Sequence, residues 1–177
     1  AAAHLLAAMV ASLREDAPCH VDTHVAAPAG LARMHLGIID QEPQPLWSAD
    51  GDVALVMVGE IYSWDGLELP AEAAGAATAE FSNARLLLAA YTQFGEAFVD
   101  HINGSFAAAI WRVREQTLLL VTDQIGTHPL YYAQVGDRLV FASGARAVAQ
   151  MPDLPRGVEV AAIAELVAYE QVFGDKT

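Results

Sequence analysis

Short apolar segments of strand length recur along the chain, and residues that favour turns separate them. Two of these segments lie at residues 31–39 and 53–58. Four more follow after residue 104, at 105–113, 117–122, 130–133 and 139–142. Segments of this length that are rich in Val, Ile, Leu and aromatic residues predict β-strands. The close spacing of the last four, with Gly-Asp and similar pairs between them, favours an antiparallel meander.

Three other segments have the period of a helix. Residues 1–13 and 158–172 carry apolar residues at intervals of three and four, and we expect the second of these helices to pack on the sheet. A third helix is expected to begin after Ser82, a suitable N-cap, and to end at Gly95. Residues 15–28 read as a connecting loop with room for a short strand, and 67–79 as a mobile loop or a short, loosely packed helix.

The order helix, strands, helix, antiparallel strands, helix predicts an α+β fold, and 177 residues predict one domain. The formal net charge of −13 argues against nucleic acid and anionic membrane surfaces as partners. The densest apolar stretch, 53–58, is too short to span a bilayer. A single cysteine, Cys19, forms no internal disulfide, so we expect a cytoplasmic location.

Candidate chemistry is sparse. The run from Gly59 to Tyr62 could present the Glu60 carboxylate and backbone amides to a small ligand, or could be a β-turn with a solvated Glu. The segment that begins with Asp123-Gln-Ile-Gly126 reads as a structural turn. The dinucleotide, P-loop and HExxH motifs are absent from the sequence.

A metal site is a weaker alternative. Cys19, His20, Asp22 and His24 lie within six residues, and two histidines spaced i, i+4 could share one face of a helix. Pro18 and the polar surroundings argue against a helix there. His35 lies in a predicted strand with no Ser or Cys nucleophile at a diagnostic spacing, which favours a packed imidazole over a general base.

Six ordered blocks of sequence resemble the glutaminase domain of asparagine synthetases, a class II glutamine amidotransferase. They are Leu36-Gly-Ile-Ile-Asp40 with Gln44-Pro45, Gly59-Glu-Ile-Tyr62, residues 86–91 with Phe94-Gly95, Asn103-Gly-Ser-Phe-Ala107 with Trp111, Asp123-Gln-Ile-Gly126 with Pro129-Leu-Tyr-Tyr132, and Phe141-Ala-Ser143. The resemblance implies the N-terminal-nucleophile hydrolase fold, a four-layer αββα sandwich of two antiparallel sheets.

The same resemblance implies a nucleophilic Cys at position one, activated by its own α-amino group. Here position one is Ala, the family's first strand is missing, and Cys19 lies beyond the first helix. We therefore assign no catalytic residue and no metal ligand within these 177 residues. Whether a Cys precedes Ala1 is left open.

The glutamine pocket implied by the resemblance is also altered. His35 replaces the Arg that binds the substrate carboxylate, Val58 replaces the Asn of the oxyanion hole, and Asn83 replaces an Asp. Gly59 and Glu60 match the family. Losing one oxyanion donor costs about 10²–10³ in rate. We therefore expect a vestigial pocket made of His35, Val58, Gly59, Glu60 and Asn83.

Three functional hypotheses follow. The first is a non-hydrolysing scaffold domain, at residues 1–177, of an ATP-dependent amide-forming ligase similar to asparagine synthetase, β-lactam synthetase or lasso-peptide cyclase. Its partners would be a downstream ligase domain of the same polypeptide, which would bind ATP and Mg²⁺, and a second copy in a homodimer; this domain itself would need no cofactor. The second is an active glutaminase whose Cys lies outside this chain. The third is a free-standing module that binds an amino acid or a protein.

Overall fold

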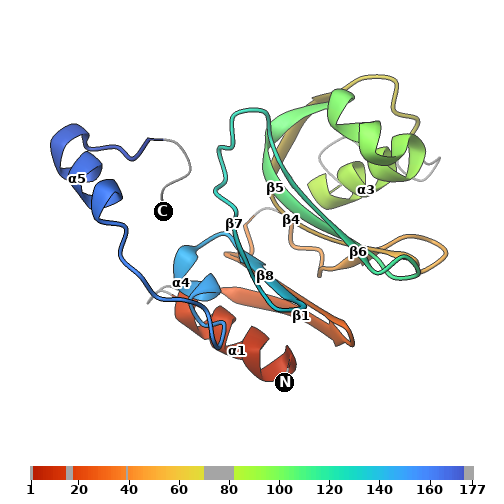
Figure 1. The fold of residues 1–177 in the computed structure, drawn as a ribbon. Coiled ribbons are helices and arrows are strands. Elements are labelled where there is room, and N and C mark those ends of the chain that lie inside the picture. The colour runs from red at the N-terminus through yellow and green to blue at the C-terminus, as the bar shows by residue number, and fades with distance from the viewer. Residues whose placement is uncertain (1, 15–17, 39, 70–81, 174–177) are drawn as a thin grey trace.

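A computed structural model describes residues 2–14, 18–38, 40–69 and 82–173 (Figure 1). The elements are, in chain order, α1 (Ala2–Leu13), β1 (His20–Ala26), β2 (Ala29–His35), β3 (Leu46–Trp47), β4 (Val53–Trp64), α3 (Asn83–Phe94), η2 (Gly95–Asp100), β5 (Ile102–Arg112), β6 (Thr117–Thr122), β7 (Tyr131–Val135), β8 (Arg138–Ala142), α4 (Ala145–Val148) and α5 (Val160–Tyr169). The α+β class predicted from the sequence is confirmed.

The centre of the fold is a four-stranded antiparallel sheet in the order β3-β4-β5-β6. Successive residues of β4 point to opposite faces, and both faces are buried. Leu55 and Met57 pack on the side of α3, whereas Ala54 and Val56 pack on the other side, toward β2 and β8. Cover on both faces explains why this strand reads as a continuous apolar run.

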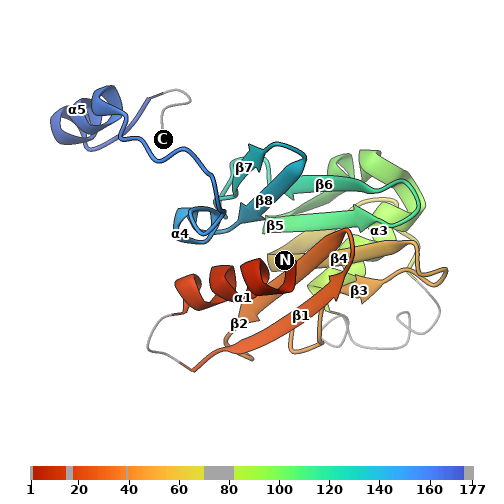
Figure 2. The same ribbon diagram turned by 60° about the horizontal axis from the view of Figure 1, so that its bottom comes forward.

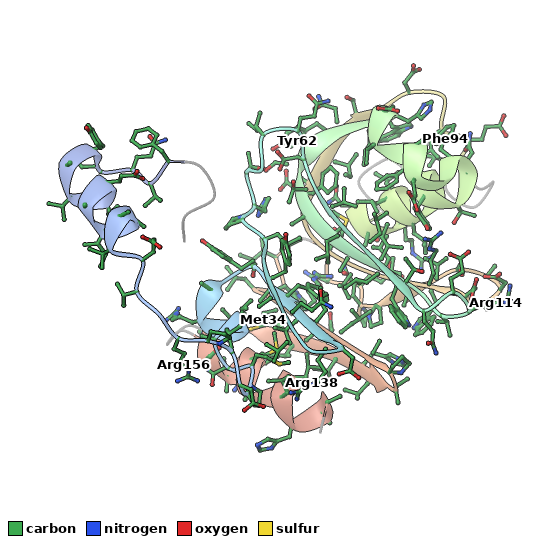
Figure 3. The ribbon with its side chains drawn as sticks, in the orientation of Figure 1. Met34, Tyr62, Phe94, Arg114, Arg138 and Arg156 are labelled. Carbon is green, nitrogen blue, oxygen red and sulfur yellow. The ribbon has the colours of Figure 1, made fainter. Side chains whose placement is uncertain are left out.

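Four layers result, in the order helix, sheet, hairpins, helix. Helix α3 and η2 cover one face of the central sheet. The hairpins β1-β2 and β7-β8 lie against the other face, and α1 with α4 packs behind them (Figures 1 and 2). Figure 3 shows side chains filling the spaces between these layers. Within the described residues, the second β layer is two separate hairpins and not one continuous sheet.

The caps of α3 agree with the sequence prediction. The Ser82 hydroxyl accepts a hydrogen bond from the Arg85 N–H at 3.2 Å, and Gly95 ends the helix with φ of 61°. Buried Leu87 and Ala90 lie on the face toward the sheet. The helix begins and ends where local chemistry provides partners for its free backbone groups.

The loop predicted over 15–28 is wrong for most of its described length. Strand β1 occupies His20–Ala26 and pairs with β2 in register from His20 opposite His35 to Ala26 opposite Ala29. The strand lies at an edge and most of it is half-buried or exposed, so it carries polar residues without an alternating apolar pattern. The segment 67–79 lies largely outside the described residues.

The predicted meander is correct only for β5 and β6. Strands β7 and β8 leave the central sheet and pair with each other in a second layer. Strand β4 is also longer than predicted: it continues through the Gly59–Tyr62 run to Trp64, with a bulge between Ile61 and Ser63. The turn predicted as one alternative for this run is therefore wrong.

The predicted last helix exists as α5, but it does not pack on the sheet. It projects from the layered body at the end of an extended segment (Figures 1 and 2). Its large apolar side chains are exposed: Val160, Ile163, Leu166, Val167 and Tyr169. In the part of the chain that the structure describes, no helix is long and apolar enough to cross a membrane.

Candidate functional site

The site residues expected from the sequence gather at one place in the fold. Two side chains bind backbone N–H groups of β4 on either side of Val58, Gly59 and Glu60: Gln44 binds Met57 at 2.7 Å, and Asn83 binds Ile61 at 2.7 Å. The loop that runs from β2 to β3 supplies the first, and the start of α3 supplies the second. This arrangement brings β2, that loop, β4 and α3 together around the predicted pocket.

His35, at the end of β2, is engaged by neighbouring groups on both ring nitrogens. The N–H of Gly37 donates to Nδ1 at 3.2 Å, so Nδ1 is unprotonated and the neutral ring carries its proton on Nε2. Nε2 lies 3.5 Å from the Asp22 carboxylate, and the ring stacks on His20 with centroids 5.3 Å apart. His35 is thus a neutral donor facing a carboxylate of its own chain.

Burial lowers the pKa of His35, the Arg33 guanidinium and His20 lower it further, and Asp22 opposes them. An imidazole held neutral cannot act as the permanent cation that binds a substrate carboxylate.

Arg33, on β2, is the buried cation of this region and is 5% exposed. Its guanidinium donates to the carbonyl oxygens of Asp40 and, at 3.2 Å, Glu42. Burial lowers the pKa of Arg33, whereas the nearby carboxylates of Asp22 and Asp40 raise it. The guanidinium therefore holds the backbone of the loop and is directed at protein carbonyls.

Asp40 and Asn83 connect that loop to the helix and to the strand. The Asp40 carboxylate accepts the N–H of Asn83, the first residue of α3, at 2.9 Å. The Asn83 side-chain oxygen then accepts the N–H of Ile61 next to the bulge of β4. A carboxylate at position 83 would accept the same bond, so Asn83 keeps the structural half of the role that an Asp would have.

Glu42 forms a second connection to the start of α3. Its carboxylate accepts from the Ser82 hydroxyl at 2.9 Å and from Arg85 Nε at 2.8 Å, and it also pairs with Arg85 Nη2. The Arg85 charge is thereby neutralised within the chain. Both arginines beside the pocket are committed to protein groups.

Gln44 is the most buried neutral polar residue of the site, with 4% of its surface exposed. Its N–H donates to Asp22 at 3.1 Å, which connects it to the His35 pair. Its side-chain oxygen binds Met57, and its Nε2 has no hydrogen-bond partner. Gln44 thus extends the β3-β4 ladder past Pro45, which has no N–H.

Gly59 and Glu60 lie where β4 and β5 approach each other most closely. Gly59 has φ of 105°, and a Cβ there would overlap the Ser105 carbonyl oxygen and come within 2.7 Å of the Phe106 Cα. Glu60 pairs with Ser105 in the register and its side chain is exposed. Val58, between these groups and Met57, presents an apolar side chain that donates no hydrogen bond.

The region offers positioning groups but no nucleophile. Among the described residues, no hydroxyl or thiol is hydrogen-bonded to a His ring, and no three His, Cys, Asp or Glu side chains are grouped to hold a metal ion. His20 and His24 lie on a strand and contact the rings of His35 and Trp47. The metal-binding alternative therefore has no geometric support in this part of the chain.

The Asp123 turn is the structural feature that the sequence predicted. Its carboxylate accepts from the Thr127 hydroxyl and from the N–H groups of Thr127, Ile125 and Phe106. The Thr127 hydroxyl bond, assisted by those backbone N–H groups, lowers the pKa of Asp123 to about 2. This network fixes the connection between β6 and β7 on the Phe106 end of β5.

Sequence reasoning missed the residues that hold the site together: Asp22, Arg33, Asp40, Glu42 and Gln44. Asp40 and Gln44 stood in the blocks that resemble the family, and Arg33 is the one basic residue of an otherwise apolar strand. A lone Arg between Leu31 and Met34 was the signal of a buried, paired guanidinium.

The state of His35 leads to a prediction about pH. Because the folded state lowers the pKa of His35 below 6.5, the unfolded chain binds more protons there, and the free energy of unfolding should fall as the pH drops through 6.5. Titration of the His35 ring by NMR should give a pKa below 6.5. Asp22→Asn should lower that pKa further, because Asp22 is the group that favours the imidazolium; a value at or above 6.5 in the unsubstituted chain would contradict the prediction.

Comparisons with known proteins agree with this geometry. A family model described as a glutamine amidotransferase domain matches residues 1–177. Asparagine synthetase (glutamine-hydrolyzing) 2 of Bacillus subtilis is 30% identical over 155 residues, 86% of this chain and 20% of that protein. Asparagine synthetase (glutamine-hydrolyzing) 1 of the same organism is 35% identical over 124 residues, 69% of this chain and 19% of that protein. Amidase chyE of Penicillium rubens is 30% identical over 133 residues, 72% of this chain and 19% of that protein.

The chain spans about a fifth of the length of these curated relatives. The matching family implies the N-terminal-nucleophile hydrolase fold, and the observed order of helix, sheet, hairpins and helix agrees with it. The match over the whole chain and the identity to asparagine synthetases lead to one conclusion: this chain belongs to the glutamine amidotransferase domain family.

Proposed function

We propose that this domain does not hydrolyse glutamine and serves as a scaffold and interface within an amide-forming ligase. The observation that carries the proposal is the engagement of His35. It occupies the position where the family resemblance implies a carboxylate-binding Arg, and it is neutral, stacked on His20 and directed at Asp22. A substrate carboxylate placed there would meet a protein carboxylate instead of a guanidinium.

The nearby guanidinium groups do not compensate. Arg33 donates to main-chain carbonyls, and Arg85 is paired with Glu42. Hydrogen bonds to charged groups contribute about 1.5–3 kcal/mol each, so redirecting a guanidinium toward substrate would sacrifice comparable interactions inside the protein. Val58 supplies no amide at the position of the oxyanion donor, which adds a rate loss of about 10²–10³.

The rest of the proposal concerns the whole protein. Because the relatives named asparagine synthetase are about five times as long, we propose that a ligase domain follows in the same polypeptide and that it binds ATP and Mg²⁺. The vestigial pocket would then serve to hold β4, α3 and the loop after β2 in one rigid unit against that domain. We propose a cytoplasmic location for this protein.

Glutamate release from glutamine tests the proposal, with the complete gene product as the enzyme. We expect no release at enzymatic rates, while ATP-dependent amide formation with free ammonia is retained as the control. Isothermal titration should show glutamine binding weaker than about 100 µM, because each lost charge-assisted contact costs roughly tenfold or more. Rapid glutamate release would instead establish an active glutaminase with its Cys outside this chain, and a dissociation constant near 1 µM would show that the altered pocket still binds.

A further inference from the structure

Strand β6 leaves one edge of the central sheet open. It is the last strand in the order β3-β4-β5-β6, and among the described residues no strand pairs with it beyond β5. Its sequence, Thr117–Thr122, contains no charge, Gly or Pro, and four of its six residues are Leu or Val. Proteins usually protect such an edge with charges, Pro or cover, because its free backbone groups attract another strand.

The direction of those backbone groups follows from the register. The N–H of Asp123 donates to the Phe106 carbonyl at 3.0 Å, so this pair belongs to the hydrogen-bonded set of the β5-β6 ladder. In an antiparallel ladder every second residue directs its N–H and C=O away from the partner. On β6 the residues that face away from β5 are Leu118, Leu120 and Thr122.

An apolar groove of about 400 Å³ lies beside this edge. It opens between β6 and the β7-β8 hairpin, where the two β layers separate, and is lined by Leu118, Leu120, Thr122, Leu130, Tyr132 and Leu139. The same three β6 residues thus have their backbone groups unpaired by a strand and their side chains in an open apolar groove. Tyr132 is 70% exposed there, so the groove is not filled by the chain's own side chains.

We propose that this surface pairs with a second copy of the chain, β6 against β6, across a two-fold axis at Leu120. In that antiparallel register Leu120 lies opposite its own copy and Leu118 opposite Thr122, so all three outward-facing residues find partners. The pairing would add about six backbone hydrogen bonds and join the two central sheets. Side chains of each β6 would cover the groove of the other copy.

The charge distribution favours a second copy over a charged partner strand. No charged side chain is brought opposite a like charge within the six-residue pairing. The other long free edge, β1, carries Asp22 and two histidines, which is the usual protection against pairing. A two-fold pairing is closed, so it predicts a dimer and no larger polymer. Each copy has a net charge of −13, so added salt should strengthen the dimer by screening repulsion.

Sedimentation equilibrium of this chain tests the pairing, together with hydrogen exchange at low and high protein concentration. We expect a dimer at about 100 µM, tighter at higher salt. The amides of Leu118, Leu120 and Thr122 should gain protection as the dimer forms. Those of Leu119 and Val121, which face β5, should be protected at every concentration.

Two variants and a control complete the test. Leu120→Lys places two like charges opposite each other, and Thr122→Pro removes an outward N–H without removing a bond to β5; both should be monomers with an unchanged circular dichroism spectrum. Ala11→Lys adds the same charge on the exposed side of α1 and should remain a dimer. A monomer in the unsubstituted chain at all concentrations, an open-ended polymer, or a dimer that persists in a folded Thr122→Pro variant would overturn the proposal.

Discussion

Replacing Gly59 by Ala is expected to lower the free energy of unfolding by at least about 3 kcal/mol, the range of changes that force backbone to move in a packed interior. The added Cβ would overlap the Ser105 carbonyl oxygen and lie 2.7 Å from the Phe106 Cα, and neither is a flexible side-chain end. The φ of 105° adds strain for any side chain. Urea unfolding followed by circular dichroism measures the change.

Two matched glycines separate overlap from backbone strain. Gly136 has φ of 63° with no atom within 4 Å of an added Cβ, so Gly136→Ala should cost only about 1–2 kcal/mol from the left-handed conformation. Gly157 has open space around it and no positive φ, so Gly157→Ala should change stability by less than about 0.5 kcal/mol. If Gly59→Ala costs no more than Gly136→Ala, β4 and β5 do not approach as closely as described.

Replacing Arg33 by Met is expected to cost about 3–5 kcal/mol of stability, as is typical when one member of a buried charged network is removed. The variant would leave the carbonyl oxygens of Asp40 and Glu42 without their buried donor. It would also leave the Asp22 and Asp40 carboxylates without the nearby positive charge. Denaturant unfolding at pH 7 measures the loss.

Arg114 provides the matched control for Arg33. It lies at the turn between β5 and β6 (Figure 3), its side chain is 69% exposed, and it pairs with Asp50 and Asp52 in solvent. Arg114→Met should therefore cost at most about 1 kcal/mol. Arg33→Lys, which keeps the charge but loses the planar fork, should fall between the two. Equal losses for Arg33→Met and Arg114→Met would show that the buried guanidinium does not anchor the loop.

The sequence predicted well those elements whose environment is symmetrical or local. Strands β4 and β5 are buried on both faces, so their apolar runs stand out, and α3 is delimited by its own caps at Ser82 and Gly95. Strand β1 was missed because an edge strand with polar residues has no such pattern. The departure of β7-β8 from the central sheet was missed because turn residues after β6 do not reveal which layer a hairpin joins.

The site was predicted only as positions and not as interactions. His35, Val58, Gly59, Glu60 and Asn83 were chosen by family resemblance, and the structure brings them around one stretch of β4. The bonds that define their state join residues far apart in sequence, such as Asp40 with Asn83, 43 residues later. Such pairing depends on how β2, β4 and α3 meet in space, and no local pattern records it.

Helix α5 has a consequence for how the chain folds. It has ten residues, and isolated helices shorter than about 12–15 residues are marginal in water even with good caps. Its ends are satisfied locally, by the Glu159 side chain at the start and by Glu170 in the left-handed conformation at the end, and Phe173 packs on Tyr169. Because it projects from the layered body, those contacts contribute little to the cooperative unfolding of the body. The helical content of this segment therefore reports on the surface that covers it, as in segments whose folding is coupled to binding.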